Sequence, residues 1–355
     1  MFDAVFLNIP LLYNYVVMLY NHSTIHLFGH RRILSGTGIS QGCNLSGLLW
    51  CLTAKKLHDR LISRIHYAYV DDLTLAGEVD DLVIDLKLII HKGTDLGLHV
   101  SFTKTQLILS NPDLIERFES FAPDLVVCQA HKAQLLGASL HPLHNTIRDN
   151  KMQEFLHFVS QIQYLKIHDA LYLLINCYGA SRLIYLLRTC SFIDPEFLSR
   201  YDSLSRRALS QIYNCELTDN QWFIASRPIK YGGLGLRLTT EIALPAFISS
   251  YNASKNLVET FLQTDISNDK FISKAMLDWR NLVGSVTPQI ITKQKAWDSI
   301  VVLDSLGKNK LPLAAQNLVR YSQHSELSIN QHPDNHSRHS DNEVRIFLAS
   351  ILGEE

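Results

Sequence analysis

The sequence lacks an excess of charge of either sign. Its 33 Lys and Arg residues meet 34 Asp and Glu residues, so the formal net charge is −1 over 355 residues. Proteins whose main task is non-specific binding of nucleic acid carry a basic excess, because neutralising phosphates supplies most of that affinity. Any nucleic-acid partner must therefore be bound by a local basic surface, or by parts of a larger protein.

Closely spaced cysteines are also absent. The six cysteines include no Cys-x-x-Cys pair, and the nearest two, Cys43 and Cys51, are eight residues apart. This is the pattern of neither a zinc site nor a disulfide framework, which favours a reducing, intracellular compartment, the nucleus included. Four tail histidines have irregular spacings and no cysteine near them, so a solvated linker is favoured over a metal site; they are His324, His332, His336 and His339.

Long apolar runs are missing as well. No stretch reaches the roughly 18 uninterrupted apolar residues of a membrane span, so no membrane partner is expected. The first twenty residues are apolar, but they have no basic segment and no small-residue cleavage site of a signal peptide. Asp3, Asn8, Pro10 and Asn14 interrupt them. We interpret this segment as the middle of a buried domain that begins abruptly.

Local patterns predict a mixed first half and a helical second half. Leu49, Leu52, Leu57 and Leu61 recur at helical spacing, and from about Asn150 long helical patterns dominate. The expected helices are Leu11–Tyr20, Leu48–Ile65, Leu82–Leu98, Phe197–Tyr213, Thr239–Leu262 and an apolar pair broken near Gly179. The expected strands flank Asp71-Asp72 and lie at Thr105–Leu109 and Gln134–Leu140, with a loop from Gly29 to Gly47.

The pattern with most chemical content is Tyr69-Val70-Asp71-Asp72, which lies between the β-prone runs HYAYV and LTLAG. Nucleotidyl transfer requires divalent cations held about 3.5–4 Å apart, and Mg²⁺ prefers carboxylate oxygens. An Asp pair on a tight hairpin supplies such oxygens. Strand side chains alternate, so one Asp is the principal ligand and the other its neighbour. The competing interpretation is an ordinary solvated turn.

Two further motifs flank this hairpin. Upstream, Gly38-Ile39-Ser40-Gln41-Gly42-Cys43-Asn44-Leu45-Ser46-Gly47 runs into a helix, and downstream Gly97-Leu98 is followed by Lys104. In this order and spacing the three segments resemble motifs B, C and D of reverse transcriptases of non-LTR retrotransposons. The resemblance implies RNA-directed DNA polymerisation, with an RNA template, a DNA primer and deoxynucleoside triphosphates as partners and Mg²⁺ as cofactor.

The resemblance also assigns roles to individual residues. Asp71 and Asp72 would bind Mg²⁺, and Gln41, Gly42 and Tyr69 would lie at the template and the incoming nucleotide. Lys104 would act as general acid at the pyrophosphate. Asn44 replaces the proline that many relatives have in this loop.

The first catalytic aspartate of the family has no counterpart. It precedes an aromatic residue by five positions, and the aromatic resembles Phe6, a steric gate in the family and otherwise a core aromatic on a strand. Counting back from Phe6 reaches Met1, while Asp3 is two positions away, a shift of roughly 6–7 Å along a strand. The resemblance therefore implies an N-terminally truncated domain with impaired catalysis. The alternatives are a non-catalytic remnant that at most binds nucleic acid, and a helical interaction scaffold.

Two segments of the later chain also resemble such enzymes. Gln134-Leu135-Leu136-Gly137-Ala138 is similar to the primer-grip hairpin. Arg227-Pro228-Ile229 and Tyr231-Gly232-Gly233-Leu234-Gly235-Leu236-Arg237 are similar to a segment that follows the palm. No strand precedes this glycine run and no Lys-Ser/Thr follows it, so a tight turn between packed helices is favoured over a phosphate loop.

The expected architecture is α+β. We predict a reverse-transcriptase palm over residues 1–145, an antiparallel sheet with helices on one face. An all-helical thumb-like domain follows over 146–262, and then a helical extension over 263–355 with a polar, disordered stretch at 322–342. The oligomeric state is left open.

Overall fold

The computed structural model describes residues 1–36, 38–40, 42–141, 146–191 and 193–308. The predictions that concern Gln41, the tail histidines and the polar stretch 322–342 lie outside these residues. The chain divides into two compact units, Met1–Leu136 and Gly137–Glu355.

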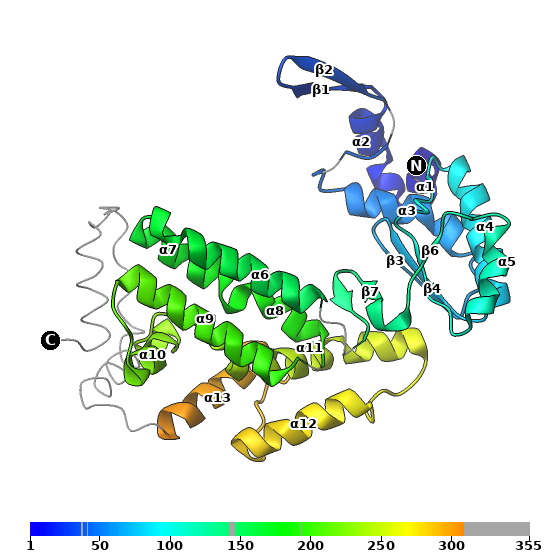
Figure 1. Cartoon of the computed structure of the whole chain (residues 1–355). Helices are drawn as coiled ribbons and strands as arrows, with labels where there is room; N and C mark the ends of the chain where they lie inside the picture. Colours follow the sequence, from blue (N-terminus) through cyan, green and yellow to red (C-terminus); the bar gives the residue numbers. More distant parts are fainter. Residues whose placement is uncertain (37, 41, 142–145, 192, 309–355) are drawn as a thin grey trace. The chain divides into compact units, whose positions relative to one another are not determined.

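The first unit contains short helices and two-stranded sheets (Figure 1). Its helices include α1 (Phe2–Asn8), α2 (Pro10–Tyr20), α3 (Ser46–His58), α4 (Val79–Asp95) and α5 (Glu116–Glu119), with 3₁₀ turns at Pro112–Ile115 (η1) and Ala130–Lys132 (η2). Its strands are β1 (Thr24–Phe28), β2 (Arg31–Ser35), β3 (Ile65–Tyr69), β4 (Asp72–Ala76), β5 (Gln106–Leu107), β6 (Val126–Val127) and β7 (Gln134–Leu135).

The N-terminal segment is helical, so the prediction of a strand around Phe6 is wrong. In α1, Ala4 and Val5 are buried, and Val5 packs with Val16 of α2 and Leu49 of α3. A strand here would have needed a partner for its backbone groups, whereas a helix pairs them within the segment. The next helix begins at Pro10, whose fixed φ and missing N–H suit the first helical turn.

The continuous antiparallel palm sheet is also not found among the described residues. Their strands form four separate two-stranded sheets, and β5 pairs with β6 in parallel. The predicted loop Gly29–Gly47 was partly wrong, because β1 and β2 form a hairpin in which Phe28 is opposite Arg31. Helix α3 ends at His58 rather than at Ile65, and Ile65 is instead the first residue of β3. The mixture of helices and small sheets remains compatible with an α+β fold.

The end of α4 follows local capping rules. Gly97 has φ 75°, the Leu98 amide donates to the Gly93 carbonyl (2.8 Å), and the Gly97 amide donates to the Thr94 carbonyl (3.0 Å). This pair of bonds is the Schellman arrangement, in which a residue with positive φ closes the helix. The predicted helix end near Gly97 is confirmed.

The second unit is helical, and most of the predicted helices are confirmed. Its elements include β8 (Ala138–Ser139), α6 (Thr146–Gln161), η3 (Ile162–Tyr164), α7 (Ile167–Leu173), a π-helical turn η4 (Leu174–Tyr178), α8 (Ala180–Thr189), α9 (Pro195–Tyr213) and α10 (Asp219–Ala225). They continue with η5 (Ile229–Tyr231), α11 (Thr239–Leu262), α12 (Lys270–Val283) and α13 (Gln294–Lys308).

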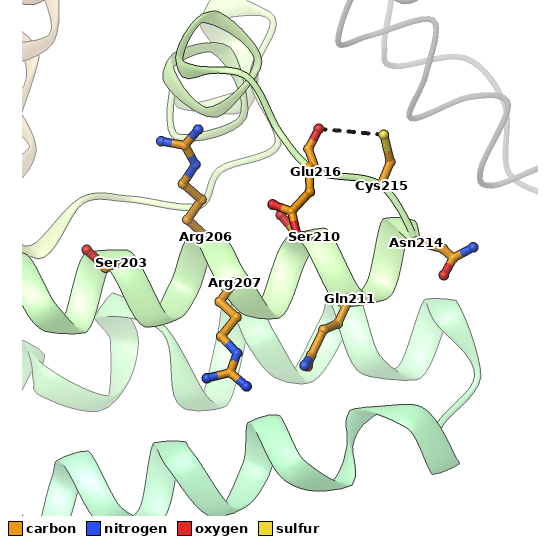
Figure 2. Close-up of a pocket in the computed structure, with 8 residues that line it drawn as sticks. All are labelled: Ser203, Arg206, Arg207, Ser210, Gln211, Asn214, Cys215 and Glu216. Atoms are coloured by element: carbon orange, nitrogen blue, oxygen red, sulfur yellow. Dashed lines mark hydrogen bonds between the residues drawn. The ribbon is translucent and has the colours of Figure 1, made fainter.

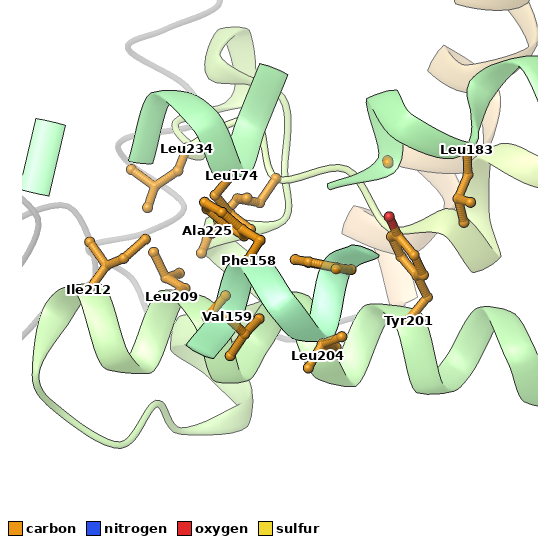
Figure 3. Packing of buried hydrophobic residues seen from close by; sticks show 14 of the residues in the cluster. Phe158, Val159, Leu174, Leu183, Tyr201, Leu204, Leu209, Ile212, Ala225 and Leu234 are labelled. Atoms are coloured by element: carbon orange, nitrogen blue, oxygen red, sulfur yellow. The ribbon is translucent and has the colours of Figure 1, made fainter. Parts of the chain in front are cut away.

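The main core of this unit lies between α6, α7, α8, α9 and the N-terminal half of α11. Phe158, Leu174, Tyr201 and Leu209 are among its buried members (Figure 3). The ring of Phe158 stacks on that of Tyr178 at 4.1 Å between centroids. A second cluster joins α11 to α12 and α13, where Trp279 and Trp297 meet edge to face.

One described stretch, Ile167–Thr189, is long and apolar enough to cross a membrane by length and composition. The helix is interrupted at Gly179, as predicted, between η4 and α8. Leu174, Leu183 and Leu187 of this stretch are buried in the main core. A core helix passes the same test, so the stretch is weak evidence for a membrane.

The glycine-rich segment after α10 is a turn between helices, as predicted. The Gly235 amide donates to the Arg227 carbonyl (2.9 Å), and the Leu234 amide donates to the Ala225 carbonyl (3.2 Å). Arg227 itself is buried, and its guanidinium bonds to Glu241 of α11 (2.7 Å) and Ser305 of α13 (2.7 Å). The turn thereby connects three helices of the second unit.

Candidate functional site: the Asp71-Asp72 hairpin

The predicted hairpin is present with a two-residue turn. Strands β3 and β4 are antiparallel, and Tyr69 is opposite Asp72, so Val70 and Asp71 form the turn. Val70 has φ 55°, which is uncommon for a β-branched residue. Asp71 lies in the turn and Asp72 is the first residue of β4, and both are exposed. The two carboxylates therefore lie at the tip of the hairpin, accessible to a ligand.

A hydrogen bond fixes this tip to the helix that follows the glycine-spaced loop. The indole Nε1 of Trp50, in α3, donates to the carbonyl of Val70. Trp50 is separated from Val70 by 20 residues in sequence. The bond thus joins the segments that resemble motifs B and C, and it holds the residue that precedes Asp71.

The loop before α3 leaves its backbone accessible. Gly42 has φ 87°, and a Cβ placed on it would meet nothing within 4 Å. Ile39 and Leu45 on either side pack against the cluster of Val5, Val16 and Leu49. The loop is therefore anchored by its apolar residues, while Gly42 presents backbone without a side chain toward open space.

A buried carboxylate that the sequence analysis missed positions the start of the hairpin. Asp85 of α4 is 0% exposed. It accepts hydrogen bonds from the amides of Ile62 (3.0 Å) and Ser63 (2.8 Å) and from the Ser63 hydroxyl (2.5 Å). These residues lie just before β3. One signal was available: Asp85 falls at helical spacing from Leu82 and Ile89, on the apolar side of an amphipathic helix.

The other predicted site residues are less closely connected. Lys104 is exposed in the turn that leads into β5. Within the described ranges, no hydrogen bond or ion pair joins it to Asp71 or Asp72. Phe6 is exposed on α1 and meets Tyr13 edge to face, with 5.2 Å between ring centroids. A hydrogen bond therefore joins the hairpin to the α3 segment, and the roles predicted for Phe6 and Lys104 stay predictions.

The segment resembling a primer grip forms a hairpin as well. Strands β7 and β8 pair, and the two residues between them, Leu136 and Gly137, have φ values of 49° and 78°. Two successive positive φ values are typical of the tightest hairpin turns.

A polar hollow of about 500 Å³ lies in the second unit, along the C-terminal half of α9 (Figure 2). Its basic residues are Arg206 and Arg207, and Glu216 also lines it. Arg206 is already engaged by Asp219 at 2.7 Å. The hollow contains no pair of acids comparable with Asp71 and Asp72, so the hairpin is the better candidate for chemistry.

The Trp50 hydrogen bond leads to a prediction for local stability. Trp50→Phe removes the donor but keeps an aromatic ring. We expect the free energy of local opening at Tyr69–Asp72 to fall by about 1 kcal/mol, so that the amides there exchange faster. Hydrogen–deuterium exchange followed by mass spectrometry measures this. Trp222→Phe, which changes an indole of the second unit, should leave these amides unchanged. Equal protection in both variants would contradict the role given to Trp50.

Comparison with known families supports the sequence motifs. Residues 7–140 match the family model described as reverse transcriptase (RNA-dependent DNA polymerase). The matched range contains the loop around Gly42, the Asp71-Asp72 hairpin and Lys104, whereas Phe6 lies one residue before it. No curated protein matches the chain. The chain therefore contains a reverse transcriptase domain, matched over residues 7–140.

Proposed function

We propose that this chain is the RNA-directed DNA polymerase part of a non-LTR retrotransposon, impaired in catalysis. The observation that carries the proposal is the pair Asp71 and Asp72 at the exposed tip of a two-residue hairpin, inside the matched range. The reaction is attack of a primer 3′-hydroxyl on the α-phosphorus of a deoxynucleoside triphosphate, with pyrophosphate as leaving group.

The carboxylates fit one magnesium ion better than two. Mg²⁺ is commonly bound by one or two carboxylates together with substrate phosphates and water, and Asp71 and Asp72 supply that number. Among the described residues there is no group of three or more His, Cys, Asp or Glu side chains that could bind a metal. When bound, the ion would neutralise the charge that develops on the phosphates. A site for two ions would need a further carboxylate, which supports the proposal of weak catalysis.

The remaining residues act on substrate groups. Gly42 has no side chain and faces open space, so a base pair can approach its backbone closely. Lys104, exposed before β5, would donate a proton to the leaving pyrophosphate. Gln41 and Tyr69 complete the proposed contacts with template and nucleotide, and in this proposal Phe6 has no steric-gate function because it lies on a helix.

A second candidate function is a non-catalytic remnant that binds nucleic acid. Asp3 lies on the helix α1 rather than on a strand, and among the described residues no third acid joins Asp71 and Asp72 in a metal-binding group. The lack of a third carboxylate would reduce catalysis, but it would not affect the binding of a nucleic-acid strand.

Primer extension tests the proposal. The full chain is incubated with an RNA template, an annealed DNA primer, deoxynucleoside triphosphates and Mg²⁺, and product length is measured. We expect slow extension that Asp71→Asn and Asp72→Asn each reduce by at least ~100-fold, because each removes a metal-binding charge. Asp124→Asn changes another exposed aspartate of the same unit and should have no effect.

The outcomes separate the two candidate functions. Extension that persists in Asp71→Asn and Asp72→Asn would contradict the assignment of these residues. Retained binding of the template and primer without any extension would favour the non-catalytic remnant.

A further inference from the structure

An acid-free segment begins near the N-terminus. Between Asp3 and Asp59 the sequence contains no Asp or Glu, but it contains Arg31, Arg32, Lys55 and Lys56. Lys55 forms an ion pair with Asp59 at 2.6 Å. No such pair involves Arg31 or Arg32 within the residues that the structure describes. In a chain of net charge −1, this segment is the kind of local basic surface that binding to a polyanion requires.

The two arginines lie on an exposed hairpin. Every residue from Asn21 to Leu34 is exposed, so both faces of the β1–β2 hairpin are open. Figure 1 shows the hairpin extending past α2, away from the other labelled elements of the first unit. Paired residues of an antiparallel hairpin project on the same face. Phe28, 76% exposed, therefore shares a face with Arg31, and Leu27, 74% exposed, shares the other with Arg32.

We propose that the β1–β2 hairpin binds single-stranded nucleic acid that crosses its tip, with a base stacked on Phe28, one backbone phosphate on Arg31 of the same face and a neighbouring phosphate on Arg32 of the other face. Single-strand binding elements combine cationic side chains that follow the backbone with aromatic rings that stack on bases. Phe28 beside Arg31 is such a combination. Because guanidinium groups bind phosphate through two hydrogen bonds, the same face can bind both parts of one nucleotide.

The charges disfavour the other occupants of this surface. A second copy of the hairpin would bring two more arginines and no carboxylate, and like charges facing each other destabilise a strand pair. An apolar protein segment would cover Ile25, Leu27 and Leu34, but it would also desolvate two guanidinium groups without a counter-charge. A phosphodiester backbone supplies that negative counter-charge at every nucleotide.

The position of the hairpin in the chain suggests which strand it binds. Strand β2 ends at Ser35 and leads directly into the loop that contains Gly42. That loop lies at the template in the proposed function, so the hairpin would bind unpaired template next to it. This assignment of the strand rests on the proposed function, whereas single-strand binding itself does not.

Binding measurements on the full chain test the arginines. Fluorescence anisotropy of a labelled 20-nucleotide oligouridine RNA gives the Kd at several salt concentrations. Arg31→Ala with Arg32→Ala should weaken binding on the order of tenfold or more at 0.1 M salt, and reduce the slope of log affinity against log salt by about 1.4. Arg60→Ala with Arg64→Ala removes two exposed guanidiniums of the same unit outside the hairpin and should change neither quantity appreciably.

The aromatic residue has its own control. Phe28→Ala should weaken binding about 5- to 100-fold through the lost stacking, and it should leave the salt slope unchanged. Leu27→Ala removes an equally exposed apolar side chain from the opposite face and should have little effect. The same measurements with an oligodeoxythymidine distinguish a preference for RNA from binding of either strand.

Several outcomes would overturn the proposal. Equal losses in the hairpin and control double variants would show that the contribution of Arg31 and Arg32 is general charge. A change from dimer to monomer in Phe28→Ala, without loss of RNA binding, would assign the surface to a second copy. These measurements report binding alone, so failure of primer extension leaves this test intact.

Discussion

Replacing Gly233 with alanine is expected to unfold the second unit or to lower its free energy of unfolding by more than about 4 kcal/mol. A Cβ on Gly233 would lie 2.1 Å from the carbonyl oxygen of Arg227 and 2.5 Å from that of Ile224. Both are backbone atoms, which cannot move away as a flexible side chain would. The same backbone of Arg227 accepts the Gly235 amide, and its side chain binds Glu241 and Ser305, so a shift there would disturb three helices.

Urea unfolding followed by far-ultraviolet circular dichroism measures this effect. Gly307→Ala is the matched control, because Gly307 lies in α13 and a Cβ there would meet nothing within 4 Å. That change should stabilise the helix by up to about 1 kcal/mol, since alanine favours a helix more than glycine does. If Gly233→Ala were as stable as the unchanged chain, the close packing of this turn would be refuted.

Asp202→Ala is expected to cost about 3 kcal/mol of unfolding free energy, the second largest effect. Asp202 of α9 is buried and accepts four hydrogen bonds at the start of α11. They come from the amide and hydroxyl of Thr239 (both 2.7 Å) and from the amide and hydroxyl of Thr240 (3.1 and 2.7 Å). Burial raises the pKa of Asp202, and the bonds from Thr240 and Thr239 oppose that rise. Alanine would leave the buried amide of Thr239 without an acceptor and would also remove the acceptor of the Thr240 amide, both at a helix N-terminus.

A local helix cap provides the comparison. Asp194 caps its own helix, α9, by accepting the Glu196 amide at 3.0 Å, and it is exposed. Asp194→Ala should cost only about 1 kcal/mol, since water can replace the lost acceptor. The same unfolding measurement applies to both variants. Equal losses would mean that Asp202 acts as an ordinary surface cap rather than as a buried link between two helices.

Asp202 is an example of a contact that could not be predicted from the sequence. The α11 segment was predicted with its bounds, Thr239–Leu262, because helical spacing is visible in the sequence. Its first turn, however, is completed by a carboxylate 37 residues earlier. No pattern within α11 indicates this partner.

The candidate site divides in the same way. The alternation of HYAYV and LTLAG around Asp71-Asp72 was enough to predict the β3–β4 hairpin, since strand pairing across a short turn depends on neighbouring residues. The hydrogen bond from Trp50 to Val70 and the burial of Asp85 depend on contacts across 20 and 23 residues. The helix α1 also depends on such contacts, because Val5 is buried only where Val16 and Leu49 meet it.

The sequence by itself determined the order of most of the helices, the Asp71-Asp72 hairpin and the end of α4 near Gly97. Each of these follows from residues within a few positions of one another, because turns, caps and periodicity are local. Only the tertiary structure decided that the N-terminal segment is a helix, that the strands remain in separate pairs, and that Asp85 and Asp202 are buried hydrogen-bond acceptors. These features depend on contacts between residues that are far apart in the sequence. A buried polar group needs a hydrogen-bond partner, and that partner can come from a distant part of the chain.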